Sequence, residues 1–241
     1  MPHRFEFIGE TGSTSADLLG RIARGEAISE GHWLIADRQT AGRGRQGRGW
    51  LDAPGNFMGS TVVRLHPQDP PPATLSFVAA LALYEAVLPR LADPRALQLK
   101  WPNDLLLAGA KLSGILLERE GEWAVIGIGV NLAATPPVAG REIRAMADHG
   151  PAPARDAFAL DLAVQMDREL HRWREFGFEP IRRRWLVAAH PPGTELAVHD
   201  GAGERIGGAF DGLEDDGALR LRLASGAIRA IRAGDVSLGD R

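Results

Sequence analysis

Three strand-like runs follow one another closely in the middle of the chain, with only short turns between them. The runs are Leu97–Trp101, Leu112–Glu120 and Trp123–Leu132, and the turns contain Pro102, Gly109 and Gly121. Turns this short connect neighbouring antiparallel strands, so we expect hairpins within one sheet. Apolar residues at helical spacing over Ala73–Leu91 predict a long core helix that packs on this sheet. These patterns restrict the fold to a sheet covered by helices.

More strands and helices are predicted on both sides of these hairpins. The expected strands are Arg4–Ile8, Trp33–Ala36 and Phe57–Leu65, and the expected helices are Ala16–Arg24, Asp156–Phe176 and Glu179–Ala188. The segment Thr11–Ser15 offers several N-cap oxygens to the first of these helices. A mixed order of strands and helices is typical of an α+β domain, in which helices cover one face of a mixed β-sheet.

From Pro191 onward the pattern changes to short alternating runs. These are Glu195–Val198, Arg205–Phe210, Ala218–Leu223 and Ala227–Ile231, punctuated by glycine and aspartate. Short strands at this spacing predict a separate small β-barrel of about fifty residues. A chain of 241 residues is long enough for one large core and one small core. The predicted domains are therefore 1–190 and 191–241.

The absence of cysteine limits the chemistry of this chain. With no cysteine among 241 residues, disulfides, thiolate metal sites and cysteine-thioester intermediates are excluded. A formal net charge of -3 argues against a broad affinity for nucleic acid or anionic membranes. Met1–Glu10 has no signal-peptide pattern, and no apolar stretch of about twenty residues is apparent. We therefore expect a cytoplasmic protein without a membrane partner.

The segment Gly42–Trp50 places three arginines among four glycines and ends in a tryptophan. Glycines let the backbone approach a ligand closely, and guanidinium groups bind phosphate oxygens bidentately. The segment thus predicts a loop that folds over an anionic ligand and becomes ordered on binding. Two other interpretations stay open, a solvated surface loop and an Arg-Gly segment that coats single-stranded nucleic acid. The spacing matches neither the P-loop nor the dinucleotide GxGxxG motif.

Five short segments share one recognisable order along the chain. They are Ser13–Ser15, Gln39–Trp50, Lys100–Asp104, Lys111–Leu116 and Gly127–Asn131. In this order they closely resemble the biotin protein ligases, also called biotin-[acetyl-CoA-carboxylase] ligases, and the run that ends in Gly234–Leu238 is similar to their C-terminal SH3-like domain. Ser15 and Gln46 depart from the pattern, because asparagine and arginine are common there. The resemblance implies a class II synthetase-like catalytic domain, with a mixed β-sheet and helices, followed by a small SH3-like β-barrel.

The resemblance implies a reaction in two steps. Biotin and ATP give biotinyl-5′-AMP and pyrophosphate, with Mg²⁺ as the expected metal, and biotin then passes to a specific lysine of a biotin carboxyl carrier protein, with release of AMP. Some members carry an N-terminal helix-turn-helix domain and also act as repressors. Because Met1 lies only a few residues before the first predicted strand, the resemblance is to the monofunctional group, and no DNA partner is expected. The acceptor carboxylase and the oligomeric state stay open, with a homodimer as one alternative.

The resemblance also assigns roles to individual residues. The expected catalytic residues are Lys111, Arg48 and Lys100. The expected biotin-binding residues are Ser13, Thr14, Ser15, Gln39, Gly42, Arg43, Gly44, Arg45, Lys111 and Gly114. The expected residues for ATP or the adenylate are Arg43, Arg45, Arg48, Trp50, Asn103, Lys111 and Asn131. Asp104 is the expected magnesium ligand, either directly or through water, with capping of its turn as the alternative.

The charges in the first step explain why cations matter. The biotin carboxylate attacks the α-phosphate of ATP, so two anions must meet and cations must offset their repulsion. Lys111 is expected between these anions, although an exposed strand lysine would look the same in sequence. Helix N-capping alone would likewise explain Ser13–Ser15. In the second step the acceptor amine attacks the mixed anhydride, which requires no nucleophile from the enzyme.

Two other functions remain open. A lipoate-protein ligase would share the fold, but such ligases usually lack the Arg-Gly loop and the turn at Lys100–Asp104. An RNA-binding module, in which the loop and the barrel form the binding surface, belongs to a different class. Acidic residues offset the arginines from Gly193 to Arg241, which argues against RNA binding.

Overall fold

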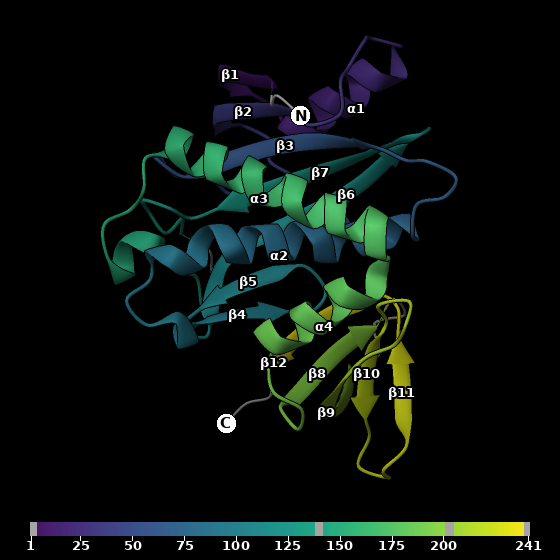
Figure 1. Ribbon diagram of the computed structural model, residues 1–241. Coiled ribbons are helices and arrows are strands. Elements are labelled where there is room, and N and C mark those ends of the chain that lie inside the picture. The colour runs from purple at the N-terminus through teal and green to yellow at the C-terminus, as the bar shows by residue number, and fades with distance from the viewer. Residues whose placement is uncertain (1–3, 138–141, 201–204, 239–241) are drawn as a thin grey trace.

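A seven-stranded mixed sheet forms the larger part of the molecule (Figure 1). The computed structural model describes residues 4–137, 142–200 and 205–238. In spatial order the strands are β1 (Arg4–Thr11), β2 (His32–Gln39), β3 (Phe57–Arg64), β7 (Trp123–Val130), β6 (Ala110–Glu120), β5 (Asp104–Leu107) and β4 (Leu97–Lys100). β1 and β2 are parallel, and all other neighbours are antiparallel. The predicted α+β class with a mixed β-sheet is confirmed.

The four strands β4 to β7 form successive hairpins, as the short turns predicted. One of them, β5, was not predicted, because its sequence was interpreted as a turn followed by connecting residues. A strand of four residues is too short to show an alternation of apolar and polar side chains, and Leu105, Leu106 and Leu107 are all buried. Ala108 and Gly109 then turn the chain with positive φ values of 49° and 81°, which suits a tight two-residue hairpin.

Three helices cover one face of the sheet. They are α2 (Leu75–Val87), α3 (Arg155–Phe176) and α4 (Phe178–Ala188), and Figure 1 shows α2 and α3 running side by side. Alternate strand residues such as Trp33, Ile35 and Ile126 point toward these helices and form the main core. Helix α2 is apolar almost all round because it lies between the sheet and α3.

The core helix also bears on the membrane expectation. The stretch Pro72–Arg90, 19 residues that include α2, is long and apolar enough to cross a membrane by length and composition. The expectation that no such stretch exists is therefore wrong. Within the structure 61% of its most apolar window is buried, and this burial explains its composition.

One short helix, α1 (Thr14–Ala23), lies on the opposite face of the sheet. Leu18 of α1 packs there against Leu34, Val62 and Val125 in a second apolar cluster. Because neighbouring strand residues point to opposite faces, the β7 positions on this side alternate with those in the main core. The face that carries α1 is also the face on which the candidate site lies.

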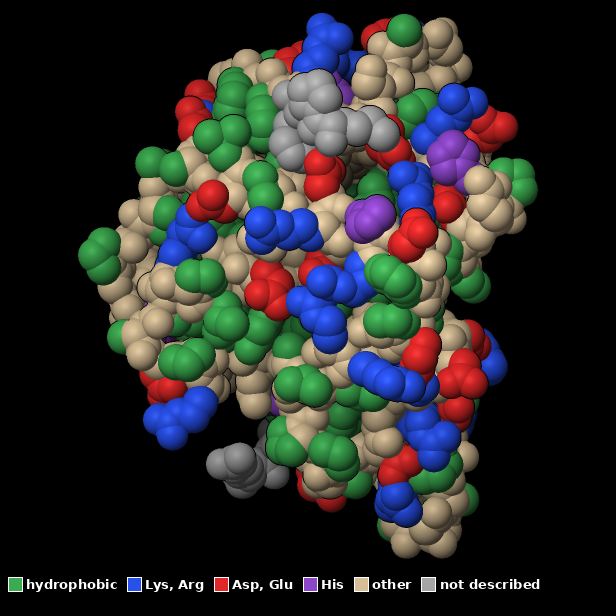
Figure 2. Space-filling model, viewed as in Figure 1, with side chains coloured by type: hydrophobic (Ala, Val, Ile, Leu, Met, Phe, Trp, Pro, Cys, Tyr) green, Lys and Arg blue, Asp and Glu red, His purple; other side chains and the backbone are tan. Residues whose placement is uncertain are grey.

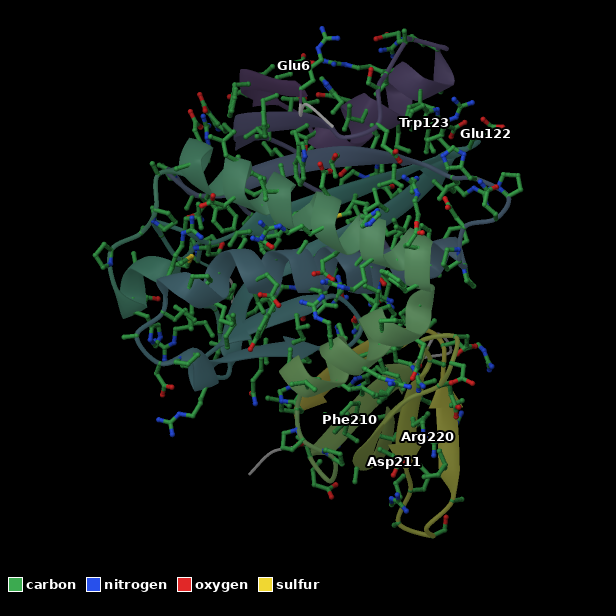
Figure 3. The ribbon with its side chains drawn as sticks, viewed as in Figure 1. Glu6, Glu122, Trp123, Phe210, Asp211 and Arg220 are labelled. Carbon is green, nitrogen blue, oxygen red and sulfur yellow. The ribbon has the colours of Figure 1, made fainter. Side chains whose placement is uncertain are left out.

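The C-terminal part is a five-stranded antiparallel sheet. In spatial order its strands are β11 (Ile228–Ile231), β10 (Leu219–Arg222), β9 (Arg205–Leu213), β8 (Glu195–Asp200) and β12 (Gly234–Leu238). Asp211 and Arg220 project from neighbouring strands (Figure 3), and Arg220 Nη2 donates to Asp211 Oδ2 at 2.9 Å. Strand β12 was not among the predicted runs. Closure of this sheet into a barrel stays a prediction.

The two sheets share a continuous core. One cluster of buried apolar side chains includes Leu99 in the large sheet and Leu196 and Leu219 in the small sheet. Trp101 Nε1 also donates to the Gly217 carbonyl oxygen across the junction at 3.1 Å. The predicted division at residue 190 falls between α4 and β8 and stays a prediction.

Candidate active site

A cavity of about 1430 Å³ lies between the α1 face of the large sheet and the edge of the small sheet. Most of the predicted site residues line it: Ser13, Thr14, Ser15, Gln39, Arg43, Gly44, Arg45, Arg48, Trp50, Lys100, Asn103, Asp104, Lys111 and Gly114. Two predicted residues, Gly42 and Asn131, are absent from this lining. Segments that are far apart in sequence thus converge on one cavity, which is large enough for a nucleotide together with a second small molecule.

Hydroxyl and amide groups form a network in one part of the cavity. Gln39 Oε1 accepts hydrogen bonds from the Thr14 backbone N–H at 2.8 Å and from Thr14 Oγ1 at 3.1 Å. Ser60 Oγ lies 2.7 Å from Thr14 Oγ1 and 2.9 Å from Ser15 Oγ. Ser13 Oγ accepts from the Ala16 N–H and caps α1, so the N-cap alternative is confirmed for this residue. The buried network provides donors and acceptors for an uncharged polar ligand.

Two glycines of β7 form part of the cavity floor. A Cβ atom at Gly127 would lie 2.3 Å from Ser15 Oγ, and one at Gly129 would lie 2.3 Å from Cε2 of Trp50. Both distances are far below van der Waals contact, so a side chain at either position would displace its neighbour. The glycines therefore let α1 and the Trp50 ring lie directly on the sheet.

The predicted glycine loop has a compact structure of its own. The Trp50 N–H donates to the Gly42 carbonyl oxygen at 2.9 Å, and the Gly44 N–H donates to the Arg48 carbonyl oxygen at 2.7 Å. At its tip Gln46 and Gly47 have φ values of 57° and 71°, which a short left-handed turn requires. Gly42 is buried behind Trp50, which explains why it does not reach the cavity.

Each of the three loop arginines contacts a different strand or turn. Arg43 forms an ion pair with Glu118 of β6 at 2.8 Å. Arg45 Nη1 donates to Asn103 Oδ1 at 3.3 Å and to the Gly234 carbonyl oxygen at 3.4 Å. Arg48 Nη2 lies 2.5 Å from Asp235 Oδ1. These contacts attach the loop to the rest of the molecule, in contrast to the solvated surface loop considered from sequence.

Asp104 lies between the only two lysines of the chain. Lys111 Nζ is 2.6 Å from Asp104 Oδ1, and Lys100 Nζ is 3.0 Å from Asp104 Oδ2. Burial alone would raise the pKa of the Asp104 carboxyl, but the two ammonium groups hold that pKa below its ordinary value. Asp104 is therefore an ionised carboxylate that fixes both lysines.

The contacts of Asp104 do not fit direct coordination of a metal ion. Both of its oxygens accept from ammonium groups, whose positive charge would repel a cation. No group of three or more His, Asp or Glu side chains suited to a metal occurs among the described residues. A divalent cation at this site would need additional anionic ligands, such as phosphate oxygens.

Asn131 lies behind the cavity rather than in it. Its side chain is 1% exposed, Asn56 Nδ2 donates to Asn131 Oδ1 at 3.3 Å, and Asn131 Nδ2 donates to the Arg144 carbonyl oxygen at 3.3 Å. The residue follows the end of β7 and ties it to neighbouring segments. The structure therefore shows Asn131 in a buried hydrogen-bond network beside the end of β7, and its contact with nucleotide stays a prediction.

Ser60, His190 and Asp235 are among the residues that line the cavity and were missed by sequence reasoning. Ser60 is a buried hydroxyl in β3, next to a second buried hydroxyl at Thr61, and two hydroxyls inside a mostly apolar strand were a usable signal. His190 is 6% exposed at the junction of the two sheets. Asp235 lies on β12, at the edge of the small sheet. The segment Gly234–Leu238 was noted for its resemblance to the family, but no role at the site was predicted for Asp235 or His190, because only the packing of the small sheet brings them there.

Comparison with known proteins places this architecture in a family. The sequence profile of the Biotin/lipoate A/B protein ligase family matches residues 20–131, and the profile of the biotin protein ligase C-terminal domain matches residues 198–239. The chain is 39% identical to the biotin-[acetyl-CoA-carboxylase] ligase of Paracoccus denitrificans, with 96% of this chain and 99% of that protein covered. The chain belongs to the biotin protein ligase family.

Other members of the biotin protein ligase family show the same relationship. The biotin-[acetyl-CoA-carboxylase] ligase of Mycobacterium tuberculosis is 35% identical, over 97% of this chain and 88% of that protein. The bifunctional ligase/repressor BirA of Escherichia coli is 32% identical, over 94% of this chain and 71% of that protein. The structure resembles the Aquifex aeolicus biotin protein ligase in complex with biotin and ATP, with a TM-score of 0.85, 26% identity and 99% of each chain covered.

Proposed function

We propose that this chain is an ATP-dependent biotin protein ligase. It forms biotinyl-5′-AMP and pyrophosphate from biotin and ATP, and it then transfers biotin to a lysine of a biotin carboxyl carrier protein in the cytoplasm. The observation that carries the proposal is the presence, in one cavity, of a neutral hydrogen-bonding network and a cluster of cations. The family relationship and the biotin and ATP in the Aquifex aeolicus relative support it.

The neutral network suits the ureido head of biotin. That head is uncharged and needs both donors and acceptors, which Thr14, Ser15 and Gln39 provide. The biotin chain is apolar, and the cavity lining beside this network includes Trp50 and Ile128. In this orientation the biotin carboxylate points toward Lys111.

The cations suit the first step, in which two anions react. A carboxylate oxygen of biotin forms a bond to the α-phosphorus, and the bond from that phosphorus to pyrophosphate breaks. Lys111 is proposed to lie between carboxylate and α-phosphate, while Arg45 and Arg48 bind the phosphates. Asp104 positions Lys111, and Arg43 holds the base of the loop through Glu118. Cations that are already in place lower the barrier without further reorganisation.

Magnesium is proposed to arrive with the triphosphate of ATP. When bound, it offsets the negative charge on the phosphates that leave as pyrophosphate. Asp104 is proposed to contact it through water, since both carboxylate oxygens already accept from lysines.

The second step needs an acceptor amine and no nucleophile from the enzyme. The uncharged lysine amine attacks the biotinyl carbonyl carbon, a C–N bond forms, and the C–O bond to AMP breaks. The absence of cysteine in this chain is compatible with this route.

The decisive experiment is an assay of both half-reactions. Purified protein with biotin, ATP and Mg²⁺ should exchange radioactive pyrophosphate into ATP and form biotinyl-5′-AMP, which mass spectrometry detects. An added carrier domain should gain the mass of one biotinyl group. Lys111→Ala should reduce exchange at least 100-fold. Exclusive use of lipoate in place of biotin would contradict the proposal.

The nucleic-acid alternative has a separate test. On the face shown in Figure 2, Lys and Arg side chains are interspersed with Asp and Glu side chains, whereas a surface that binds RNA through its charge needs a continuous basic patch. We expect no binding to a labelled RNA or single-stranded DNA oligonucleotide at physiological salt. Tight, salt-dependent binding would revive that function.

A further inference from the structure

Three consecutive residues of β12 contact three cations of the candidate site. The Gly234 carbonyl oxygen accepts from Arg45 at 3.4 Å, Asp235 pairs with Arg48 at 2.5 Å, and the Val236 carbonyl oxygen accepts from Lys100 Nζ at 2.8 Å. Within the part of the chain that the structure describes, strand β12 is an edge strand that pairs with β8 alone. Its free edge, which would otherwise pair with another strand, faces these cations.

Asp235 provides the negative charge at this edge. Arg45 and Arg48 come from one loop and repel each other. Burial lowers the pKa of Arg45, the charge of Asp235 raises it, and the charge of Arg48 lowers it again. The carboxylate of Asp235 therefore offsets the repulsion between the two guanidinium groups and allows them to remain neighbours.

The contact with Asp235 uses only part of the Arg48 side chain. Arg48 Nε donates to the Arg45 carbonyl oxygen at 3.3 Å, and Arg48 Nη2 donates to Asp235. Within residues 4–137, 142–200 and 205–238, Nη1 of Arg48 has no hydrogen-bond partner, although the residue lines the cavity. A guanidinium group held on one side in this way can present its remaining N–H groups to a phosphate.

We propose that Asp235 is a positioning residue for nucleotide binding, which fixes Arg48 and keeps Arg45 beside it so that both arginines face the triphosphate. The small sheet thereby supplies part of the nucleotide site. This inference rests on the proposed function, because it assigns phosphate binding to the two arginines. In the alternative, Asp235 competes with the phosphates of ATP for Arg48 and must be displaced when ATP binds. Removal of the Asp235 charge would then raise the affinity for ATP, whereas our proposal predicts that it lowers this affinity.

The first test measures ATP dependence in variants of Asp235. Asp235→Asn removes the charge with little change of shape, and it should raise the KM for ATP about tenfold in pyrophosphate exchange. The KM for biotin should change less than twofold, because biotin is proposed to bind at the hydroxyl and amide network of Thr14, Ser15 and Gln39. Asp235→Glu should restore most of the ATP affinity. The matched control is Asp215→Asn, because Asp215 also pairs across the junction, with Arg182 of α4 at 3.3 Å, and it should leave both KM values unchanged.

A second test asks whether Asp235 acts through Arg48. In an Arg48→Ala background, Asp235→Asn should add less than a twofold change in ATP affinity, measured by titration calorimetry of the full chain. Thermal unfolding of each variant separates this effect from loss of folding. A lower KM for ATP in Asp235→Asn would favour the competitor, and an unchanged KM, or an undiminished effect without Arg48, would overturn the inference. Failure of the proposed function looks different, since the unmodified chain would then form no biotinyl-5′-AMP.

Discussion

Lys111 Nζ lies 2.6 Å from Oδ1 of Asp104, and the other oxygen of that carboxylate contacts Lys100. The lysine proposed to stand between two reacting anions is thus held by a third anion from the protein. This arrangement orients the ammonium group before ligands arrive, but it also means that part of its charge is already offset. Substitution of Asp104 therefore measures whether the orientation of Lys111 or the partial offset of its charge has the larger effect on the reaction rate.

Asp104→Asn should slow adenylate formation because Lys111 and Lys100 lose their shared carboxylate. We expect a decrease of about 10- to 100-fold in the rate of pyrophosphate exchange, which corresponds to about 1.4 to 2.7 kcal/mol of transition-state stabilisation. Asp69→Asn is a suitable control, since Asp69 pairs with Arg174 away from the cavity. An exchange rate equal to that of the unmodified chain would show that Lys111 does not depend on this carboxylate.

Gly129→Ala should disturb the biotin pocket through Trp50. The new Cβ would lie 2.3 Å from the indole ring, so the ring must move, and we expect the affinity for biotin to fall at least tenfold. The free energy of unfolding should decrease by about 1 to 3 kcal/mol. Calorimetric titration with biotin and urea unfolding measure the two effects. Gly9→Ala, on β1 with no atom within 4 Å of the new Cβ, should leave biotin affinity unchanged.

His190 should make the stability of the protein depend on pH. Burial and the nearby charge of Lys100 lower the pKa of His190 from 6.5 to about 4. Between these values the unfolded chain binds more protons than the folded chain, so the free energy of unfolding falls as the pH falls through this window. From pH 7 to pH 5 the contribution of His190 is about 1 to 2 kcal/mol.

Urea unfolding at several pH values tests this contribution of His190. His190→Gln should unfold with a weaker pH dependence between pH 7 and pH 5 than the unmodified chain. His66→Gln replaces an exposed imidazole in a loop and should reproduce the unmodified pH profile. Parallel profiles for His190→Gln and the unmodified chain would refute the assignment.

The lysine content predicts resistance to self-modification. Biotinyl-5′-AMP is a mixed anhydride that acylates free amines, and the only two lysines of this chain are both engaged by Asp104. After long incubation with biotin and ATP but no acceptor, peptide mapping should find no biotin on lysine. Arg95→Lys places an amine at a position where the side chain is 89% exposed, and this variant should gain biotin there. Biotin on Lys111 in the unmodified chain would contradict the prediction.

Local patterns in the sequence were sufficient for most elements of the fold. The hairpins of the large sheet follow from short turns, the core helix α2 from its apolar periodicity, and the start of α1 from the N-cap Ser13. Each of these signals involves only a few neighbouring residues, so it can be identified from the sequence without knowledge of distant contacts. The fifth strand of the small sheet and the short strand β5 lacked such a signal and were missed. The order of five motifs was likewise enough to predict the family, and most of the residues predicted for the site line the cavity.

The tertiary structure decided which of those residues contact one another. Arg48 and Asp235 are 187 positions apart in sequence, and only the placement of β12 against the loop makes them an ion pair. Gly129 of β7 lines the cavity, whereas Asn131, just past the end of that strand, is buried and hydrogen-bonded to Asn56 and to the Arg144 carbonyl oxygen. Sequence periodicity indicates which face of an element is apolar, whereas the partner of a charged side chain depends on how separate sheets pack. For this reason the cations and Asp104 could be identified from sequence, but the pairing of Asp104 with both lysines and of Asp235 with Arg48 could not.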